Sequence, residues 1–436
     1  MPPDGWMIFV RVVPITPLNG VGGPCCSSTV ITIIEKRMVC MKKRKLISTL
    51  MLGSILCLPV IAQANSPKQE ISTQSISYNT ISVEEAKKAI NNFIKKNEQL
   101  HDLRDGKIVF KEHLYDIDDT VVGYYFTVES EKTKGYFITS AVDTIDPMIQ
   151  YGIDVDLEET LNKKMKDEKV YYFGVNKFSF GKSGKEVKEK FEKAKSATLK
   201  KLKAEKKDGT EEYKKVEKAQ LKSLKKGDKR SPGWDGLLKD SSDGMISIAA
   251  TDYKVLSGVD RIYQRSSGIN NPSSACGPTV AAMIMDYYHD ELGYNVRDNA
   301  YYGSWAALVN HLYNEMGSTW LGTTITMWAN GALTHVYHTS NAWSSNKVTD
   351  AVGNSSKFIG AIDSYDPVAI RFDLFDSGGA QIEYHFVCGI GYDKNGSYAG
   401  DLHVAYKDPD NGADNTGTHW FDWTGDDQDI EFAWLS

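Results

Sequence analysis

The sequence predicts an α+β protein in which two folded domains are joined by a charged helical linker. One observation is that composition changes twice, from a mixed region to a strongly basic one and then to an acidic, aromatic-rich one. A second is that helix-like and strand-like hydrophobic patterns occur together in both outer regions. The length of 436 residues suits two or three domains of roughly 100–200 residues each. We therefore expect a first domain at residues 65–180, a linker at 181–246 and a second domain at 247–436.

Composition excludes several classes of protein. Charged residues make up 25% and hydrophobic residues 41% of the chain, which argues against wholesale disorder, collagen and coiled coil. The net charge of -6 gives no reason to expect a nucleic-acid partner. Six cysteines are too few for a disulfide scaffold of this size.

The N-terminal segment has the pattern of a secretory signal peptide. Met41 opens a basic Met-Lys-Lys-Arg-Lys start, an apolar run follows, and Ala62-Gln63-Ala64 ends the segment. This order is typical of a cleaved signal at residues 41–64, and the shortness of the run together with Pro59 argues against a membrane anchor. We interpret residues 1–40 as an upstream extension. We expect a secreted, extracellular or cell-surface-associated protein with no stable membrane insertion after signal removal.

The first domain is expected to open with a helix and continue with strands. Ser82-Val83-Glu84-Glu85 begins the helix with acidic residues in its first turn. Apolar residues then follow at helical spacing, namely Ala86, Ile90, Phe93 and Ile94. Residues 107–110, 121–128 and 135–140 read as strands. The region is therefore a small α+β domain.

The linker is strongly basic. Residues 181–230 hold 19 Lys/Arg and 9 Asp/Glu, a net charge of +10. A few apolar residues mark one thin helical face that breaks at Asp208-Gly209, namely Val187, Phe191, Leu199 and Leu202. A polyanion-binding arm is one interpretation, but interleaved acids and scarce aromatics favour a solvated helical arm with a loosely ordered backbone. Residues 247–436 hold nine Lys/Arg and 23 Asp/Glu, a net of -14, so we expect linker and second domain to touch.

Cys276 is the candidate nucleophile of the second domain. Pro278 suits a first helical turn, and buried-helix spacing follows in Val280, Met283, Ile284, Tyr287 and Tyr288. The positive end of that helix would favour a thiolate on Cys276, just before its start. The alternative is an inert buried cysteine, but the preceding loop, residues 266–274, is polar.

His385 is the candidate base. The mature chain offers several histidines as candidates for this role, namely His289, His311, His335, His338, His385 and His403. His385 alone stands inside a buried-strand run, residues 381–392, where an imidazole needs a polar partner. A second strand, 402–408, follows a turn at 393–396. An even-length loop would pair His385 with Tyr406 or Asp408 and put His403 on the opposite face, whereas an odd loop or a bulge would break this pairing.

Asp408 is therefore the expected partner of His385, and Asp410 is the fallback. Cys388 lies three residues after His385 among apolar neighbours, so we expect it in the core. A Cys276–Cys388 disulfide is the alternative, and it would remove the nucleophile.

These residues resemble a known family. Cys276-Gly277-Pro278-Thr279, His385 with the following Gly389-x-Gly391-Tyr392-Asp393, and Asp408-Pro409 resemble the papain-like cysteine peptidases related to bacteriocin-processing (double-glycine) peptidases. The resemblance covers roughly residues 250–425. It implies a nucleophile-bearing helix packed on an antiparallel sheet, a Cys-His-Asp triad, and a glutamine that assists the oxyanion, for which Gln264 is the matching residue.

A second resemblance concerns the first domain. Residues 135–143 and 147–152 are similar to the prodomain of streptopain-type cysteine proteases. This similarity implies a zymogen in which the first domain is an intramolecular partner of the peptidase and the linker is cleavable, with residues 222–243 as the expected region of cleavage. A constitutive substrate-binding or surface-binding domain is the alternative.

The sequence thus predicts a secreted papain-like cysteine peptidase made as a pro-enzyme and acting on peptide or protein substrates. The alternatives are an inactive papain-like module for surface binding or adhesion, and an amidase or acyltransferase that uses the same triad. We expect no metal and no organic cofactor, because the histidines lack recognisable ligand spacing and no Rossmann or phosphate-loop glycines occur.

Overall fold

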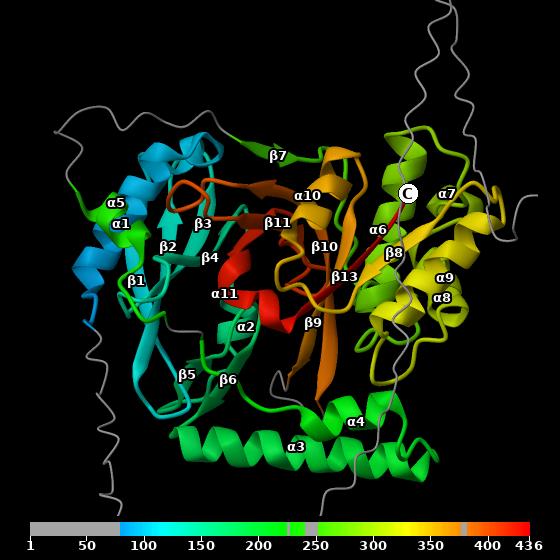
Figure 1. Cartoon of the computed structure of the whole chain (residues 1–436), viewed down its shortest axis with the longest axis horizontal. Coiled ribbons are helices and arrows are strands. Elements are labelled where there is room, and N and C mark those ends of the chain that lie inside the picture. Colours follow the sequence, from blue (N-terminus) through cyan, green and yellow to red (C-terminus); the bar gives the residue numbers. More distant parts are fainter. Residues whose placement is uncertain (1–78, 225–226, 240–251, 376–381) are drawn as a thin grey trace, which may run out of the picture. The chain divides into compact units, whose positions relative to one another are not determined.

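A computed structural model describes residues 79–224, 227–239, 252–375 and 382–436, all within one folded unit, Thr73–Ser436. Figure 1 gives the arrangement of its elements. The predicted extension (1–40) and signal peptide (41–64) lie outside the described residues. Within the described ranges, none of the helices has the length and apolar character needed to cross a membrane.

The N-terminal region is a helix packed on an antiparallel sheet. Helix α1 (Val83–Lys96) begins with the expected capping box between Ser82 and Glu85, and its predicted apolar face is buried. The 3₁₀ helix η1 (Glu98–Leu103) follows it. The strands and the short helix after it are β1 (Lys107–Tyr115), β2 (Val121–Glu129), β3 (Lys134–Ser140), β4 (Met148–Ile153), α2 (Glu158–Leu161), β5 (Lys169–Tyr172) and β6 (Phe178–Gly181). The three strands expected from sequence are present, whereas β4 to β6 were not anticipated.

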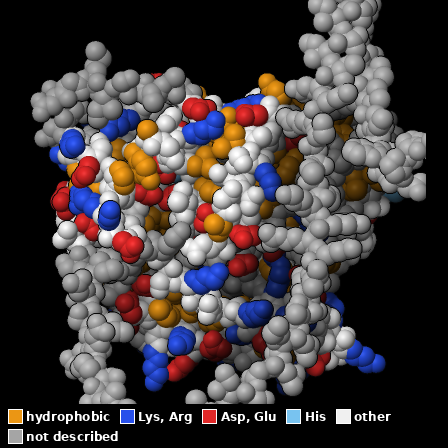
Figure 2. All heavy atoms as spheres, in the orientation of Figure 1, with side chains coloured by type: hydrophobic (Ala, Val, Ile, Leu, Met, Phe, Trp, Pro, Cys, Tyr) orange, Lys and Arg blue, Asp and Glu red, His pale blue; other side chains and the backbone are white. Residues whose placement is uncertain are grey.

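The basic segment forms two helices, α3 (Gly184–Ala204) and α4 (Glu211–Lys218). They break near Gly209, whose φ of 74° lies in the left-handed region, as the sequence predicts. Lys/Arg and Asp/Glu side chains are mixed along this edge in Figure 2. The expected loose ordering is wrong, because the apolar face of α3 and α4 is buried with C-terminal residues Leu321, Ile382 and Tyr384.

Helix α5 (Pro232–Leu238) returns to the N-terminal region. Trp234 is fully buried and its Nε1 donates to the carbonyl of Ile145 at 2.9 Å. Asn92 of α1 donates to the carbonyl of Leu237 at 2.7 Å. The last part of the predicted linker is therefore packed as part of the N-terminal region.

The C-terminal region combines helices with six sheet strands and one short edge strand. Its elements are β7 (Tyr253–Val255), α6 (Cys276–Asp290), α7 (Asn299–Tyr302), α8 (Trp305–Glu315), α9 (Ile325–Tyr337), β8 (Ser345–Val348), α10 (Ser355–Asp363), β9 (Val368–Phe375), β10 (Glu383–Asp393), β11 (His403–Lys407), β12 (Thr418–Asp422), α11 (Trp423–Asp426), η2 (Asp427–Asp429) and β13 (Ile430–Leu435). Helices α6 to α9 gather beside the sheet in Figure 1. The structure confirms the expected α+β class, with a mostly antiparallel sheet.

One sheet runs through both regions. Its strand order is β6-β5-β1-β2-β3-β4-β12-β11-β10-β9-β13-β8, with β7 paired to β10 at the side. The two regions join where β4 pairs antiparallel with β12. At this junction Tyr151 faces Trp420, and their rings stack with centroids 5.8 Å apart. Main-chain hydrogen bonds therefore connect the N-terminal and C-terminal regions.

The predicted register of the β10–β11 hairpin is wrong, but Asp408 still lies on the same face of the sheet as His385. Asp393 faces His403, so the loop contains an odd number of residues. Gly389, not His385, faces Tyr406. A bulge between Gly389 and Gly391 adds one residue to β10 and offsets the odd loop. Asp408 therefore returns to the face that carries His385.

Candidate active site

Cys276 is the first residue of α6, rather than the residue before it as expected. Pro278 lies in the first helical turn, where its missing N–H costs no intrahelical hydrogen bond. Every residue from Cys276 to Tyr288 is buried, so the helix is fixed by the core around it. The Sγ of Cys276 lies 3.7 Å from the carbonyl oxygen of Tyr384, and the thiol is free. The sulfur therefore lies at the N-terminal end of α6, where the helix dipole is positive.

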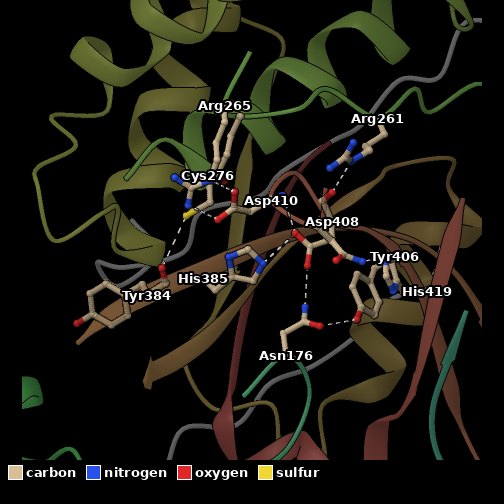
Figure 3. Close-up of polar contacts among 12 residues, drawn as sticks. Asn176, Arg261, Arg265, Cys276, Tyr384, His385, Tyr406, Asp408, Asp410 and His419 are labelled. Carbon is tan, nitrogen blue, oxygen red and sulfur yellow. Dashed lines mark hydrogen bonds and ion pairs between the residues drawn. The ribbon is translucent and has the colours of Figure 1, made fainter. Parts of the chain in front are cut away.

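His385 projects from β10 toward Cys276 (Figure 3). Its Nε2 lies 3.0 Å from Oδ1 of Asp408, so Nδ1 is the nitrogen left for the thiol. Desolvation lowers the pKa of His385, but the negative charge and hydrogen bond of Asp408, with a further contribution from Cys276, hold the pKa well above 6.5. An imidazolium beside a thiol is the arrangement that favours a reactive thiolate.

Asp408 follows the last residue of β11 and is buried. Its Oδ1 also accepts the backbone N–H of Asp410 at 2.8 Å, and its Oδ2 accepts Nδ2 of Asn176 at 2.8 Å. Burial alone would raise the pKa of Asp408, but His385 outweighs burial and lowers the pKa to about 2. The fallback residue Asp410 instead forms a two-pronged ion pair with Arg265. Of the two acids, Asp408 is the one that contacts His385.

Gln264 lies beside the same site. It is buried, its backbone N–H donates to the carbonyl of Pro409 at 2.9 Å, and its Nε2 donates to the carbonyl of Pro272 at 2.8 Å. Arg261 donates from Nε to the carbonyl of Asp408 at 2.6 Å and so fixes the same loop. Gln264, Cys276 and His385 line one cavity, which brings all four predicted site residues together.

The N-terminal region forms part of the wall of this cavity. The cavity has a volume of about 120 Å³, and its lining includes Val175, Asn176 and Lys177 from the β5–β6 turn and Phe178 at the start of β6. Asn176 has a φ of 59°, a left-handed conformation that asparagine tolerates better than most residues. Besides donating to Asp408, Asn176 accepts the hydroxyl of Tyr406 through Oδ1 at 3.3 Å.

Several contributors to this site were not predicted. They are Asn176, Arg261, Arg265 and His419. His419 stacks on Tyr406, and its Nδ1 lies 2.8 Å from the hydroxyl of Tyr136. Burial lowers the pKa of His419 to about 4, which keeps this ring neutral. The chain carries no local signal for Asn176 or His419, because tertiary contacts place both: Asn176 comes from the N-terminal region, and His419 is placed by the pairing of β11 with β12.

The remaining predicted residues lie apart from the thiol. Cys388 is fully buried, and burial raises the pKa of its thiol, which confirms the expected core position. Cys276 and Cys388 are both free, so the alternative disulfide is not formed. His403 lies 3.2 Å from Asp401 and packs against Phe93 and Tyr151. His403 therefore belongs to the contact between the two regions.

Comparison with protein-family models agrees with this division. Residues 256–436 match the Peptidase_C39 like family, and residues 78–171 match the family described as Spi protease inhibitor. No curated protein and no solved structure gave a match. The chain thus contains a Peptidase_C39-like domain, of a cysteine peptidase type, and an N-terminal region similar to the Spi protease inhibitor family. The family models confirm both resemblances inferred from the sequence motifs.

Proposed function

We propose that the C-terminal region is an active papain-like cysteine peptidase and that the whole chain is its precursor. The observation that carries the proposal is the juxtaposition of Cys276 at the start of α6, His385 near the start of β10 and Asp408 just after β11. The thiol lies at a helix N-terminus, and the imidazole is oriented by a buried carboxylate. This is the chemistry required for nucleophilic attack on a carbonyl carbon.

In the proposed reaction, the Cys276 thiolate attacks the peptide carbonyl carbon and forms a tetrahedral intermediate. The backbone N–H of Cys276 stabilises the oxyanion, since first-turn N–H groups have no intrahelical partner. The side-chain amide of Gln264 is the second donor. His385 gives its proton to the leaving amine, and a thioester remains on Cys276. Water then attacks the thioester while His385 takes its proton, which releases the acid and restores the pair of Cys276 thiolate and His385 imidazolium.

The N-terminal region acts as an inhibitory prodomain in this proposal. Asn176 holds the second carboxylate oxygen of Asp408, and the β5–β6 turn forms a wall of the cavity that Cys276 and His385 also line. A peptide substrate must pass through the same cavity, so the covering turn and a substrate exclude each other.

The basic linker strengthens this cover. Thr198 of α3 accepts the backbone N–H of Ile382 at 3.2 Å, two residues from Tyr384, whose carbonyl contacts Cys276. Lys215 of α4 pairs with Glu431 at 2.7 Å. Helix α5 packs on α1 of the N-terminal region, whereas β7, the next element, pairs with β10 of the C-terminal region. We therefore expect activating cleavage between Leu238 and Tyr253, which overlaps the end of the region expected from sequence, residues 222–243, and extends beyond it.

Secretion is part of the proposal and follows from the signal-like segment at residues 41–64. Mass spectrometry of the N-terminus of the product from the native host checks it directly. A product that starts just after Ala64 supports the proposal, and peptides from residues 1–40 in the exported product contradict it.

Cleavage of an unfolded protein substrate such as casein tests the enzymatic function. We expect the purified chain, after processing, to cleave the substrate and Cys276→Ala to be inactive. Cys388→Ala is the matched control, because it also removes a buried thiol but lies outside the site. Loss of activity in Cys388→Ala alone, or cleavage that persists in Cys276→Ala, would overturn the assignment. An intact, folded wild type that never cleaves peptides would favour a binding module.

A further inference from the structure

A second cluster of polar side chains lies between α8 and α9, two helices that lie side by side in Figure 1. Three imidazoles surround the carboxylate of Glu315. Nε2 of His311 lies 3.1 Å and Nδ1 of His335 lies 3.0 Å from Oε2, and Nε2 of His338 lies 2.7 Å from Oε1. Three nitrogens and one carboxylate thus converge, with no role in the peptidase site.

The orientation of His335 is that of a metal ligand. Its ring is fully buried, and Nε2 lies 2.7 Å from the carbonyl oxygen of Arg297. A carbonyl only accepts hydrogen bonds, so Nε2 must carry a proton. Nδ1 is then the ring nitrogen that faces the cluster and is placed to bind a cation. Metal-bound histidines typically donate their second ring N–H to a carbonyl or carboxylate in this way.

His311 supports the same interpretation. Its Nε2 is buried and, in the part of the chain that the structure describes, makes no hydrogen bond despite its proximity to Glu315. The ring stacks on Tyr302, with centroids 4.6 Å apart, which restricts its rotation. A buried nitrogen that faces other ligands but makes no hydrogen bond is satisfied if it binds a cation.

The spacing of the atoms fits a small tetrahedral ion. Ligand atoms of His311, Glu315 and His335 all lie within 4.8 Å of one another. Around a tetrahedral zinc ion, with bonds of about 2.0–2.1 Å, neighbouring ligand atoms are about 3.3 Å apart. The observed 3.0 Å and 3.1 Å separations therefore need only a slight expansion. Imidazole nitrogens favour zinc over magnesium or calcium.

We infer that His311, Glu315 and His335 bind Zn²⁺ and so join α8 to α9. His338, which contacts the other carboxylate oxygen, Oε1, would hold Glu315 in place from outside this set of three ligands. Helix α9 also contacts the nucleophile-bearing helix. Nε1 of Trp328 on α9 donates a hydrogen bond to the carbonyl of Gly277, the residue after Cys276, at 3.1 Å. The sequence alone does not reveal this cluster, because His335 is 20 residues from Glu315 and only the packing of α9 against α8 brings them together.

Zinc titration of the full-length, untagged chain tests the inference. Cys276→Ala is the background, since it removes the thiol that could bind zinc beside His385. After metal is stripped with a chelator, we expect one Zn²⁺ to bind per chain by calorimetry. His311→Ala, at a partly exposed position, should weaken binding by at least about 100-fold, and His338→Ala, which removes only the partner of Glu315, by about 10-fold or more. The matched control is His101→Ala, an exposed histidine on η1.

Two further readouts separate this site from other ligands. Co²⁺ in place of Zn²⁺ should give the visible absorption of a tetrahedral nitrogen–oxygen site without the charge-transfer band that thiolate ligands add. Zn²⁺ should also raise the Tm of the Cys276→Ala background but not of the His311→Ala/His338→Ala double variant. Absence of Zn²⁺ binding, or unchanged affinity and spectrum in the double variant, would overturn the inference and leave the cluster as a hydrogen-bonding network.

Discussion

At the scale of single residues, the polar contacts of Asp408 determine how His385 is presented to Cys276. Asp408 receives hydrogen bonds from the Asp410 backbone and from Asn176, so its carboxylate has one orientation. Its contact with Nε2 of His385 then directs Nδ1 toward the thiol. The same contact supplies the charge that holds the pKa of His385 well above 6.5.

The first prediction concerns the pH profile of kcat/KM in the processed enzyme. Because the pKa of His385 is raised, the imidazolium should persist above the ordinary titration range of histidine, and activity should fall only at higher pH. Asp408→Asn removes the charge that raises this pKa, so the basic limb should move to lower pH. We also expect Asp408→Asn to lower kcat by roughly 10²–10⁴-fold, less than the roughly 10⁶-fold loss for His385→Ala. An unshifted basic limb in Asp408→Asn would contradict this account.

His403 provides a control for the catalytic role assigned to His385. It is fully buried against Phe93 and Tyr151 and does not line the cavity that holds Cys276. We therefore expect His403→Ala to keep the kcat of the processed enzyme within about twofold while lowering the Tm of the precursor by several degrees, as large-to-small core changes do. A catalytically dead His403→Ala enzyme that retains its fold, alongside an active His385→Ala enzyme, would reverse the roles assigned here.

At the scale of elements, β4 and β12 join the two regions. Gly417, just before β12, has no room for a side chain: an added Cβ would meet the backbone of Ile153 and Asp154 at the end of β4. All three of the nearest atoms belong to the N-terminal region. The glycine is therefore required by the contact between regions and not by the packing of the peptidase region itself.

Gly417→Ala should open this strand pair without disturbing the peptidase region. We expect backbone amides of β4 and β12 to exchange at least about tenfold faster in the full-length variant, which corresponds to about 1.4 kcal/mol. The control is Gly360→Ala on α10, where an added Cβ meets no atom within 4 Å. Unchanged exchange in β4, or an equal increase throughout α6, would show that the contact does not depend on this glycine.

Local sequence patterns predicted the elements well and the long-range contacts poorly. The capping box at Ser82 and the buried spacing after Cys276 are set by neighbours in the chain, so both helices could be predicted. The length of the loop after Asp393 and the bulge in β10 leave no comparable local signal, and the hairpin register was wrong for that reason. Asp408 was still found because an odd loop and a bulge cancel. Asn176 was missed because only tertiary pairing brings the β5–β6 turn to the site.

At the scale of the whole molecule, an acidic cluster makes the contact between the two regions sensitive to pH. Asp146 of the N-terminal region meets Asp401 and Asp422 of the C-terminal region, with carboxylate oxygens within 4.8 Å of one another. Burial and then the charge of Asp401 raise the pKa of Asp146, and burial and the same neighbour raise that of Asp422 well above its ordinary value. His403, beside Asp401, partly offsets this effect on Asp146.

These raised values mean that the folded precursor binds protons more tightly than the unfolded chain. The free energy of unfolding should therefore fall as pH rises above about 4, the ordinary carboxyl pKa, through the raised values. Asp146→Asn removes one of the three charges, so its Tm should exceed that of wild type at pH 8 and differ less between pH 5 and pH 8. Asp105→Asn, an exposed acid, is the control. A Tm for Asp146→Asn that lies below wild type at pH 8 would contradict this reading of the cluster.

The most direct test of the central claim is the alkylation rate of Cys276 in the full-length chain, followed by peptide mapping after iodoacetamide treatment at neutral pH. Cys388 serves as an internal reference, because burial raises its pKa and keeps it unreactive. If His385 activates the thiol, Cys276 in wild type should react at least about 100-fold faster than Cys276 in His385→Ala, since the thiolate is the reactive species. Equal rates at Cys276 in the two proteins would contradict the assignment of a Cys276–His385–Asp408 triad.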